Sequence, residues 1–322
     1  MAIIASHPSE ASSARGKPSP RRRTRRLSTR DNVILGAMVG VPTMLHVVLV
    51  WLPTLVSIIL SFAKWDGIGG LSSIKWVGLK NYDTMFTALP TFWPAVEHNI
   101  IWLVFFILLP TPFGIFLAYQ LDKNIRFSKL YQTAIFLPMV ISTAVIGFIW
   151  ETVYDPNNGL VNSLIGANKP GHFYIEWLGN SQLNLWAILI AAGWRQAAYI
   201  MILYLAGLKS ADPALSEAAA LDGASEWQTF IRVTFPSLKP INMVVLVVTI
   251  IESLRAFDIV YVIGGSGGTK PGLELLSILI TNNILGESSL IGYGSALAVV
   301  LLVVSLVPIL SYLFSTIRKE YS

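Results

Sequence analysis

The sequence has 322 residues, of which 54% are hydrophobic and only 13% are charged, whereas a soluble domain carries about 25% charged residues. With a mean hydropathy of +0.62, this composition excludes an ordinary soluble protein, because so much apolar surface has to be buried in lipid. The absence of cysteine excludes disulfides and thiolate metal sites. The net charge of +5 does not indicate nucleic-acid binding, because of where the basic residues lie.

Residues 1–32 form a segment rich in Ser, Pro and Arg, with the run RRRTRR at Arg21–Arg26. This composition is typical of a disordered basic arm. A signal peptide is disfavoured because the apolar run that follows is too long. A nucleic-acid-binding arm is disfavoured because no folded basic domain accompanies it. We interpret the arm as a cytoplasmic anchor that obeys the positive-inside rule.

Six runs of about 20 apolar residues follow, each long enough to cross a bilayer as a helix. They predict an all-α polytopic membrane protein with six transmembrane helices, in a membrane domain at 33–316 before a short tail at 317–322. The patch Leu273–Leu285 is too short and contains two asparagines, so we expect an outer-surface or half-inserted helix there. The predicted spans are Val33–Phe62, Asn99–Leu121, Thr133–Tyr154, Leu185–Leu208, Ile241–Ile263 and Ile291–Thr316.

The positions of Lys and Arg predict the orientation of these spans. With the N-terminus inside, 16 of the 23 Lys and Arg residues fall in cytoplasmic segments and 5 fall in outer loops. The remaining two, Arg195 and Arg255, lie within spans. Because basic residues concentrate on the cytoplasmic side, this bias predicts that both termini and the segment 209–240 are cytoplasmic.

The segment 209–240 is polar, lies between two apolar runs and carries two sets of helix signals. Asp212 suits an N-cap, and Gly223 suits a left-handed helix stop. Ser225 starts a second capping pattern, and we expect Pro236 to end that second helix. The pattern predicts two short helices bent at Gly223, which can lie in a groove of another protein.

This segment resembles the EAA loop of permease subunits of ABC importers. Glu217-Ala218-Ala219 is followed by Gly223 at the spacing of that family, and Val233, Phe235 and Pro236 fall where Ile, Leu and Pro are expected. The resemblance implies that the segment is a coupling loop that docks on an ATPase subunit. The residues that it implicates in coupling are Glu217, Ala218, Ala219, Asp222, Gly223 and Pro236.

Other segments resemble the maltose-type, carbohydrate-uptake branch of the same family. They are KWVGLKNY at Lys75–Tyr82, AIFLPMVIS at Ala134–Ser142, DPNNGLVN at Asp155–Asn162, AFDIVYVIGG at Ala256–Gly265 and IGYGSALAVV at Ile291–Val300. The resemblance implies a multi-pass subunit of the bacterial plasma (inner) membrane that pairs with a second, related permease, as a heterodimer. It also implies two copies of an ABC ATPase, which bind ATP and Mg, and an extracytoplasmic solute-binding protein.

The chain itself shows no cofactor site. It has no Walker A motif, and its four histidines lack metal-ligand spacing. No catalytic constellation indicates an enzyme, so energy has to come from a partner or a gradient. The resemblance implies that a partner subunit hydrolyses ATP and that the permease works by alternating access.

Charged residues inside the spans are the first candidates for the substrate path, because such charges are costly and usually face a cavity or a partner. Arg195 and Glu252 fall about midway along their spans, and we expect them to be linked directly or through water. Three-residue steps place Glu252, Arg255 and Asp258 on one face of a helix. These charges either tether the helices or line the path.

Tryptophans at similar depth, Trp150 and Trp194, are candidates for stacking on a sugar, the alternative being an interfacial aromatic belt. Two other functions stay open at this level. A gradient-driven secondary transporter could use Glu252 and Asp258 as proton carriers. An ABC importer of a glycerol phosphate or another polyol could use Arg195 or Arg255 to hold an anion.

Overall fold

The computed structural model describes residues 28–320, except residues 69, 124, 168–173, 266–269 and 287–288. The chain divides into two compact units, 1–53 and 54–322, which are described separately. Most of the predicted basic arm, residues 1–27, lies outside the described residues, as do residues 321–322.

The first unit contains α1 (Thr29–His46) and the π-helical turn η1 (Val47–Trp51). A capping box starts α1, in which the Ser28 N–H donates to the carboxylate of Asp31 at 3.1 Å. No residue of α1 is buried, although the helix is strongly apolar. Its side chains are therefore available to lipid or to another chain.

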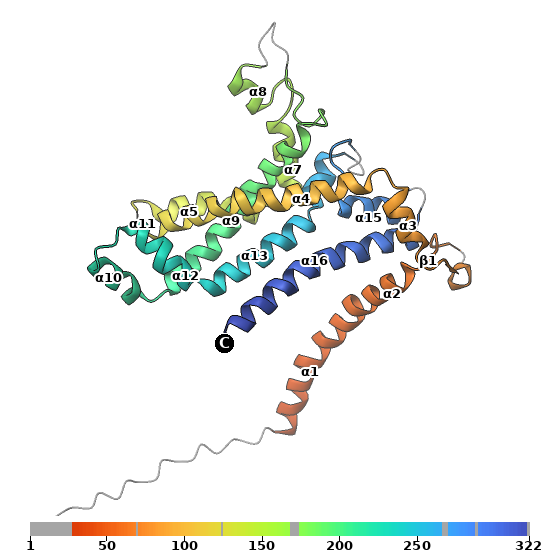
Figure 1. Cartoon of the computed structure of the whole chain (residues 1–322), viewed down its shortest axis with the longest axis horizontal. Helices are drawn as coiled ribbons and strands as arrows, with labels where there is room; N and C mark the ends of the chain where they lie inside the picture. Colours follow the sequence, from red (N-terminus) through yellow and green to blue (C-terminus); the bar gives the residue numbers. More distant parts are fainter. Residues whose placement is uncertain are drawn as a thin grey trace, which may run out of the picture. The chain divides into compact units, whose positions relative to one another are not determined.

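The second unit is helical apart from a short hairpin of β1 (Ala63–Lys64) and β2 (Lys75–Trp76), within the residues described (Figure 1). Its helices are α2 (Leu52–Leu60, which begins in the first unit), η2 (Leu71–Ser73), α3 (Lys80–Thr87), α4 (Phe92–Leu108), α5 (Pro110–Asp122), α6 (Ser128–Val140), α7 (Thr143–Val153), α8 (Leu160–Ile165), α9 (Asn184–Ser210), α10 (Pro213–Leu221), α11 (Glu226–Thr229), η3 (Phe230–Thr234), α12 (Phe235–Ser237), α13 (Lys239–Leu254), α14 (Asp258–Ile263), α15 (Leu276–Leu285) and α16 (Ile291–Glu320).

In this unit, α5 packs closely and over much of its length against α9. A Cβ atom on Gly114 would lie 2.6 Å from the carbonyl oxygen of Ala197 and 2.8 Å from Cβ of Ile200, so only glycine allows this approach. Small residues serve this purpose between membrane helices, where packing rather than water exclusion drives association. The pair positions α9, which contributes Ala192, Arg195 and Gln196 to the central cavity described below.

Among the described residues, four helical segments are long and apolar enough to cross a membrane: Thr29–Leu60, Phe92–Asp122, Asn184–Ser210 and Ile291–Ser311. They agree with four of the six predicted spans. The other two predicted spans are not single helices of that length. In one, α13 has only 16 residues and ends at Leu254. The prediction of a helical membrane protein is therefore confirmed, whereas the count of six spans is not.

The run predicted as one span at Thr133–Tyr154 is bent by 102° between α6 and α7. Ile141 is extended, and Ser142 has N-cap geometry with its side chain accepting from the Val145 N–H at 3.4 Å. Because the cap satisfies a free N–H group at the start of α7, the chain starts a new helix in a new direction. The expectation of one continuous helix is wrong at this point.

The apolar patch predicted as a surface or half-inserted helix is α15, and three of its residues are buried (Leu276, Ile278 and Leu279). Leu276 and Leu279 pack with Met85 of α3, Phe92 of α4 and Leu297 of α16. The prediction of a short helix is confirmed, and three of its residues belong to the core of this unit.

Candidate functional site: a central cavity and the 209–240 segment

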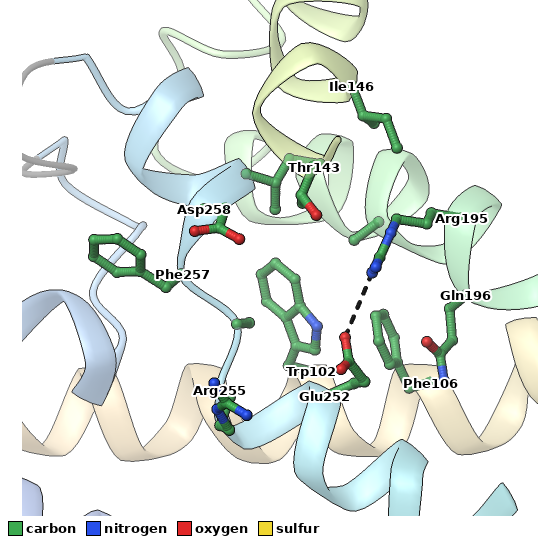
Figure 2. A pocket seen from close by; sticks show the side chains of 13 residues that line it. Trp102, Phe106, Thr143, Ile146, Arg195, Gln196, Glu252, Arg255, Phe257 and Asp258 are labelled. Carbon is green, nitrogen blue, oxygen red and sulfur yellow. Dashed lines mark hydrogen bonds and ion pairs between the residues drawn. The ribbon is translucent and has the colours of Figure 1, made fainter. Parts of the chain in front are cut away.

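A cavity of about 190 Å³ lies among α4, α7, α9 and the junction of α13 with α14 (Figure 2). Four charged residues line it together with aromatic, amide and hydroxyl side chains. Arg195 stands near the middle of the candidate span Asn184–Ser210. The lining residues are Trp102, Phe106, Thr143, Ile146, Ala192, Arg195, Gln196, Glu252, Arg255, Ala256, Phe257, Asp258 and Ile259.

The charged residues of this cavity do not share one helix face, so that prediction is wrong. α13 ends at Leu254, Arg255 is its C-cap, and Asp258 begins α14. Arg255 and Asp258 therefore stand on either side of a break in the backbone. All of these charges nevertheless line one cavity.

Side chains from two other helices satisfy carbonyl groups around this break. Asn99 of α4 donates to the carbonyl oxygen of Ser253 at 3.4 Å, and its own oxygen accepts from the Leu276 N–H at 3.0 Å. Ser277 of α15 donates to the carbonyl oxygen of Ala256. Because buried backbone groups need partners in a membrane, these side chains allow the helix to end inside the apolar region.

Arg195 and Glu252 form the ion pair expected from the sequence. Nη1 of Arg195 lies 3.5 Å from Oε2 of Glu252, and the two side chains point toward each other in Figure 2. The side chains are 32% and 43% exposed, so the pair faces the cavity rather than a dry core. It joins α9 to α13 and lines the cavity, so it can act both as a tether and as part of the lining.

Several polar groups of the cavity have no partner among the described residues. Nε1 of Trp102, Nε of Arg195 and Nε2 of Gln196 are buried donors without a hydrogen bond. No ion pair joins Arg255 or Asp258 to another described residue. Unsatisfied buried donors are costly, and a ligand rich in oxygen acceptors would satisfy them.

The two tryptophans singled out from the sequence lie outside this lining. Trp150 and Trp194 contact each other at 6.0 Å between ring centroids, and Trp194 is 42% exposed. The aromatic residues that line the cavity are Trp102, Phe106 and Phe257. Nothing in the sequence separates Trp102 from other apolar span residues, whereas Gln196 is an amide within a span and could have been noticed.

The 209–240 segment contains the expected capped helices. The side chain of Asp212 accepts from the Ala214 N–H at 3.0 Å at the start of α10. Gly223 has a φ of +81°, and the Ala224 N–H donates back to Ala219, which is the hydrogen bond of a left-handed helix stop. Ser225 and Gln228 form the capping box of α11.

Most residues implicated in coupling are accessible. Glu217, Ala218, Asp222, Gly223 and Pro236 are exposed, and Ala219 is buried. α11, η3 (Phe230–Thr234) and α12 run on from one another, and the helix ends at Ser237, one residue after Pro236. The predicted end of the second helix is therefore confirmed to within one residue.

The base of this segment is fastened to the end of α5. Nζ of Lys123 lies 2.6 Å from Oε2 of Glu226 and 4.3 Å from the ring centre of Tyr119. The Tyr119 ring also packs on Phe230 and Trp227, at 4.6 Å and 5.4 Å between centroids. The hydrogen bond to Glu226 raises the pKa of Lys123, and the same bond lowers the pKa of Glu226.

No group of three or more His, Cys, Asp or Glu side chains that could hold a metal ion occurs among the described residues. The groups that the described residues present in the cavity are suited to recognition by charge, hydrogen bonding and stacking.

Known proteins share this sequence pattern. The profile of the family described as "Binding-protein-dependent transport system inner membrane component" matches residues 110–319. A probable ABC transporter permease protein of Pyrococcus horikoshii is 30% identical over 289 residues, which cover 89% of this chain and 95% of that protein. The xylose/arabinose import permease protein XacH of Haloferax volcanii is 31% identical over 277 residues, which cover 85% of each chain.

A solved structure shares the fold. It is the crystal structure of a bacterial ABC transporter involved in the import of the acidic polysaccharide alginate, with a TM-score of 0.74 and 23% sequence identity. The alignment covers 90% of this chain and 96% of the other.

Proposed function

The chain belongs to the family of binding-protein-dependent transport system inner membrane components, and from this membership we propose that it forms half of the translocation path for a sugar or sugar-like solute. It is a permease subunit of an ABC importer, and a separate ATPase hydrolyses the ATP. This replaces the gradient-driven transporter that the sequence pattern had left open.

The observation that carries the choice of solute is the balance of groups around the central cavity. Two guanidinium groups and two carboxylates line it, beside the unpartnered donors of Trp102 and Gln196. A sugar offers hydroxyl groups that both donate and accept, so it can satisfy all of these groups without adding charge. Its apolar ring face can lie against an aromatic ring such as Trp102 or Phe257.

The test is transport of the cognate solute by the whole importer in proteoliposomes, after that solute has been identified by release from the purified solute-binding protein. Trp102→Phe removes one hydrogen-bond donor from the cavity, and we expect it to raise the KM for transport about 2- to 10-fold. Trp194→Phe is the matched control outside the cavity. Equal effects of the two substitutions would argue against this site.

The same experiment decides a second solute class. Arg255 is exposed at the cavity and has no ion-pair partner among the described residues, which favours a phosphate-bearing polyol such as a glycerol phosphate. Release of a phosphorylated solute from the binding protein would replace the neutral sugar in this proposal.

The assembly that we propose contains this chain, a second, related permease, two ATPase subunits that bind ATP and Mg, and the solute-binding protein. Both termini and the 209–240 segment face the cytoplasm, an orientation supported by the distribution of Lys and Arg. ATP-driven closure of the ATPase pair draws the 209–240 segments of the two permeases together and opens the cavity outward. A reporter after Ser322 reads as cytoplasmic and one within 155–182 as external; the reverse would overturn the orientation.

A further inference from the structure

A second cavity, of about 290 Å³, lies between the β1–β2 hairpin, α3 and the start of α16. In Figure 1 these elements lie at the opposite end of the second unit from the 209–240 segment. Its polar lining includes Lys64, Trp65, Lys80 and Tyr293, and its apolar lining includes Val77 and Leu290. None of these residues lines the central cavity, so the two cavities are separate.

The floor of this cavity is held rigidly. The side-chain amide of Asn81 donates to the carbonyl oxygens of Ser61 and Ala63, at 2.8 Å and 2.9 Å. On the other side, a Cβ atom on Gly292 would lie 2.0 Å from the carbonyl oxygen of Ala63, so α16 approaches the hairpin without a side chain between them. The lining side chains therefore stand on a preorganised frame.

Positively charged side chains lie at and beside this cavity. Lys64 pairs directly with Lys75 across the hairpin, and like charges in that position are destabilising. Lys80 lines the same cavity. No carboxylate of a described residue lies within 4.0 Å of these three amino groups. An anion bound here would remove the repulsion.

Two buried polar atoms at the cavity also have no partner. Nε1 of Trp65 and the hydroxyl of Tyr293 are buried and make no hydrogen bond among the described residues. Both can donate to an oxygen acceptor. Two amino groups, an indole N–H and a phenol hydroxyl form a donor set suited to a phosphate group.

The position of the cavity indicates the source of that phosphate. The cavity follows Leu60, where the apolar α2 ends, and it lies beside Ile291, where the apolar α16 begins. The ends of apolar helices mark the boundary between lipid and water, where Trp, Tyr and Lys concentrate. Val77 and Leu290 offer an apolar wall next to the donors.

We propose that this cavity binds the phosphate headgroup of an anionic membrane lipid, with Lys64, Lys80, Trp65 and Tyr293 as its donors. The bound lipid neutralises the lysine cluster and fastens the hairpin to the start of α16. This site does not depend on the transported solute. Its test is therefore separate from the test of the central cavity.

The experiment compares the assembled importer in nanodiscs of phosphatidylcholine with nanodiscs that also contain phosphatidylglycerol. Native mass spectrometry measures the retained phosphatidylglycerol, and thermal unfolding measures its stabilising effect. We expect Lys64→Gln with Lys80→Gln to lower the apparent affinity for phosphatidylglycerol at least about tenfold, as for loss of charged hydrogen bonds. The control is Lys129→Gln, an exposed lysine on α6 with no ion-pair partner among the described residues, which should change nothing.

Tyr293→Phe separates a binding role from a packing role. Without phosphatidylglycerol it should keep or raise the unfolding temperature, because it removes an unsatisfied buried hydroxyl. With phosphatidylglycerol it should reduce the lipid-dependent rise. Unchanged lipid retention in both the lysine and tyrosine variants would overturn the proposal.

Two further outcomes would also overturn it. If inorganic phosphate added to phosphatidylcholine nanodiscs reproduces the full stabilisation, the ligand is a free anion. If the lysine variants lose stimulation by the solute-binding protein equally in both lipid mixtures, the cluster is a protein-docking surface.

Discussion

Nζ of Lys123 lies 2.6 Å from Oε2 of Glu226, and this ion pair joins the end of α5 to the second helix of the 209–240 segment. The two residues are 103 positions apart in the chain. Because α5 is packed tightly on α9, the segment is attached to the helix that carries Arg195 of the central cavity. The segment and the cavity are therefore connected through packed helices.

The first prediction concerns this ion pair. Lys123→Glu should place like charges together and weaken attachment of the ATPase about two- to fivefold, the modest effect of an exposed ion pair. The double variant Lys123→Glu with Glu226→Lys should restore attachment, because the attraction returns with reversed signs. The measurement is co-purification of the ATPase with each variant.

The recovery in the double variant is the decisive result. If the loss of ATPase attachment in the double variant equals the sum of the losses in the two single variants, Lys123 and Glu226 act separately. Arg126→Glu on the neighbouring turn is the control, since Arg126 forms no ion pair with a described residue.

The second prediction concerns pH. The pKa of Glu226 is lowered, so its contribution is present above the ordinary value of 4.5 and is lost as pH falls through the lowered value. The pKa of Lys123 is raised, so its contribution is present below the ordinary value of 10.5 and is lost as pH rises through the raised value. Attachment should therefore be independent of this pair's titration at neutral pH.

The check is co-purification of the ATPase between mildly acidic and mildly alkaline pH, with Glu226→Gln as the comparison. The ratio of wild-type to variant attachment should stay constant over that range. A change in this ratio near neutrality would mean that another titrating group controls the attachment.

The third prediction concerns Arg195 and Glu252. Arg195→Gln or Glu252→Gln alone leaves the other charge without its partner, which should cost about 1 to 3 kcal/mol in stability or assembly. The double variant should recover part of that loss, because both charges are then removed. Thermal unfolding of the purified importer and solute transport are the two measurements.

Losses that simply add would show that each charge has a separate partner. Full recovery of assembly without recovery of transport is also informative, because it assigns the pair to solute passage as well as to tethering of α9 and α13.

The fourth prediction concerns the bend of the 209–240 segment. A Cβ atom on Gly223 would meet no atom within 4 Å, so any loss on substitution comes from the backbone φ of +81° rather than from a clash. Gly223→Val should therefore abolish ATPase stimulation, whereas Gly223→Asn should keep most of it, because Asn tolerates the left-handed region. Hydrolysis stimulated by the loaded binding protein measures both.

Glu217→Lys serves as the electrostatic counterpart, since Glu217 is exposed on α10. Glu217→Lys should weaken ATPase attachment. A charge-reversed residue on the ATPase should restore attachment of Glu217→Lys, but it should not restore the function of Gly223→Val. If ATP hydrolysis is stimulated normally in both Glu217→Lys and Gly223→Val, the segment 209–240 does not couple the permease to the ATPase.

The sequence alone determined the features that depend on neighbouring residues. The caps at Asp212 and Ser225 and the bend at Gly223 are local, because each side chain or glycine acts on a backbone group within a few positions. The long apolar helices can also be predicted locally, because each apolar run is long enough by itself to cross a bilayer. The predicted orientation follows in the same way from the Lys and Arg residues of each connecting segment.

Tertiary structure alone decided where helices break and which side chains meet. α13 ends at Leu254, beside carbonyl groups that Asn99 and Ser277, from other helices, satisfy. Trp102, from a third place in the chain, lines the central cavity next to that break. No local sequence pattern encodes these partners. Inside a membrane, a helix can end only where another group replaces the lost backbone hydrogen bonds, and here that group comes from a distant part of the chain.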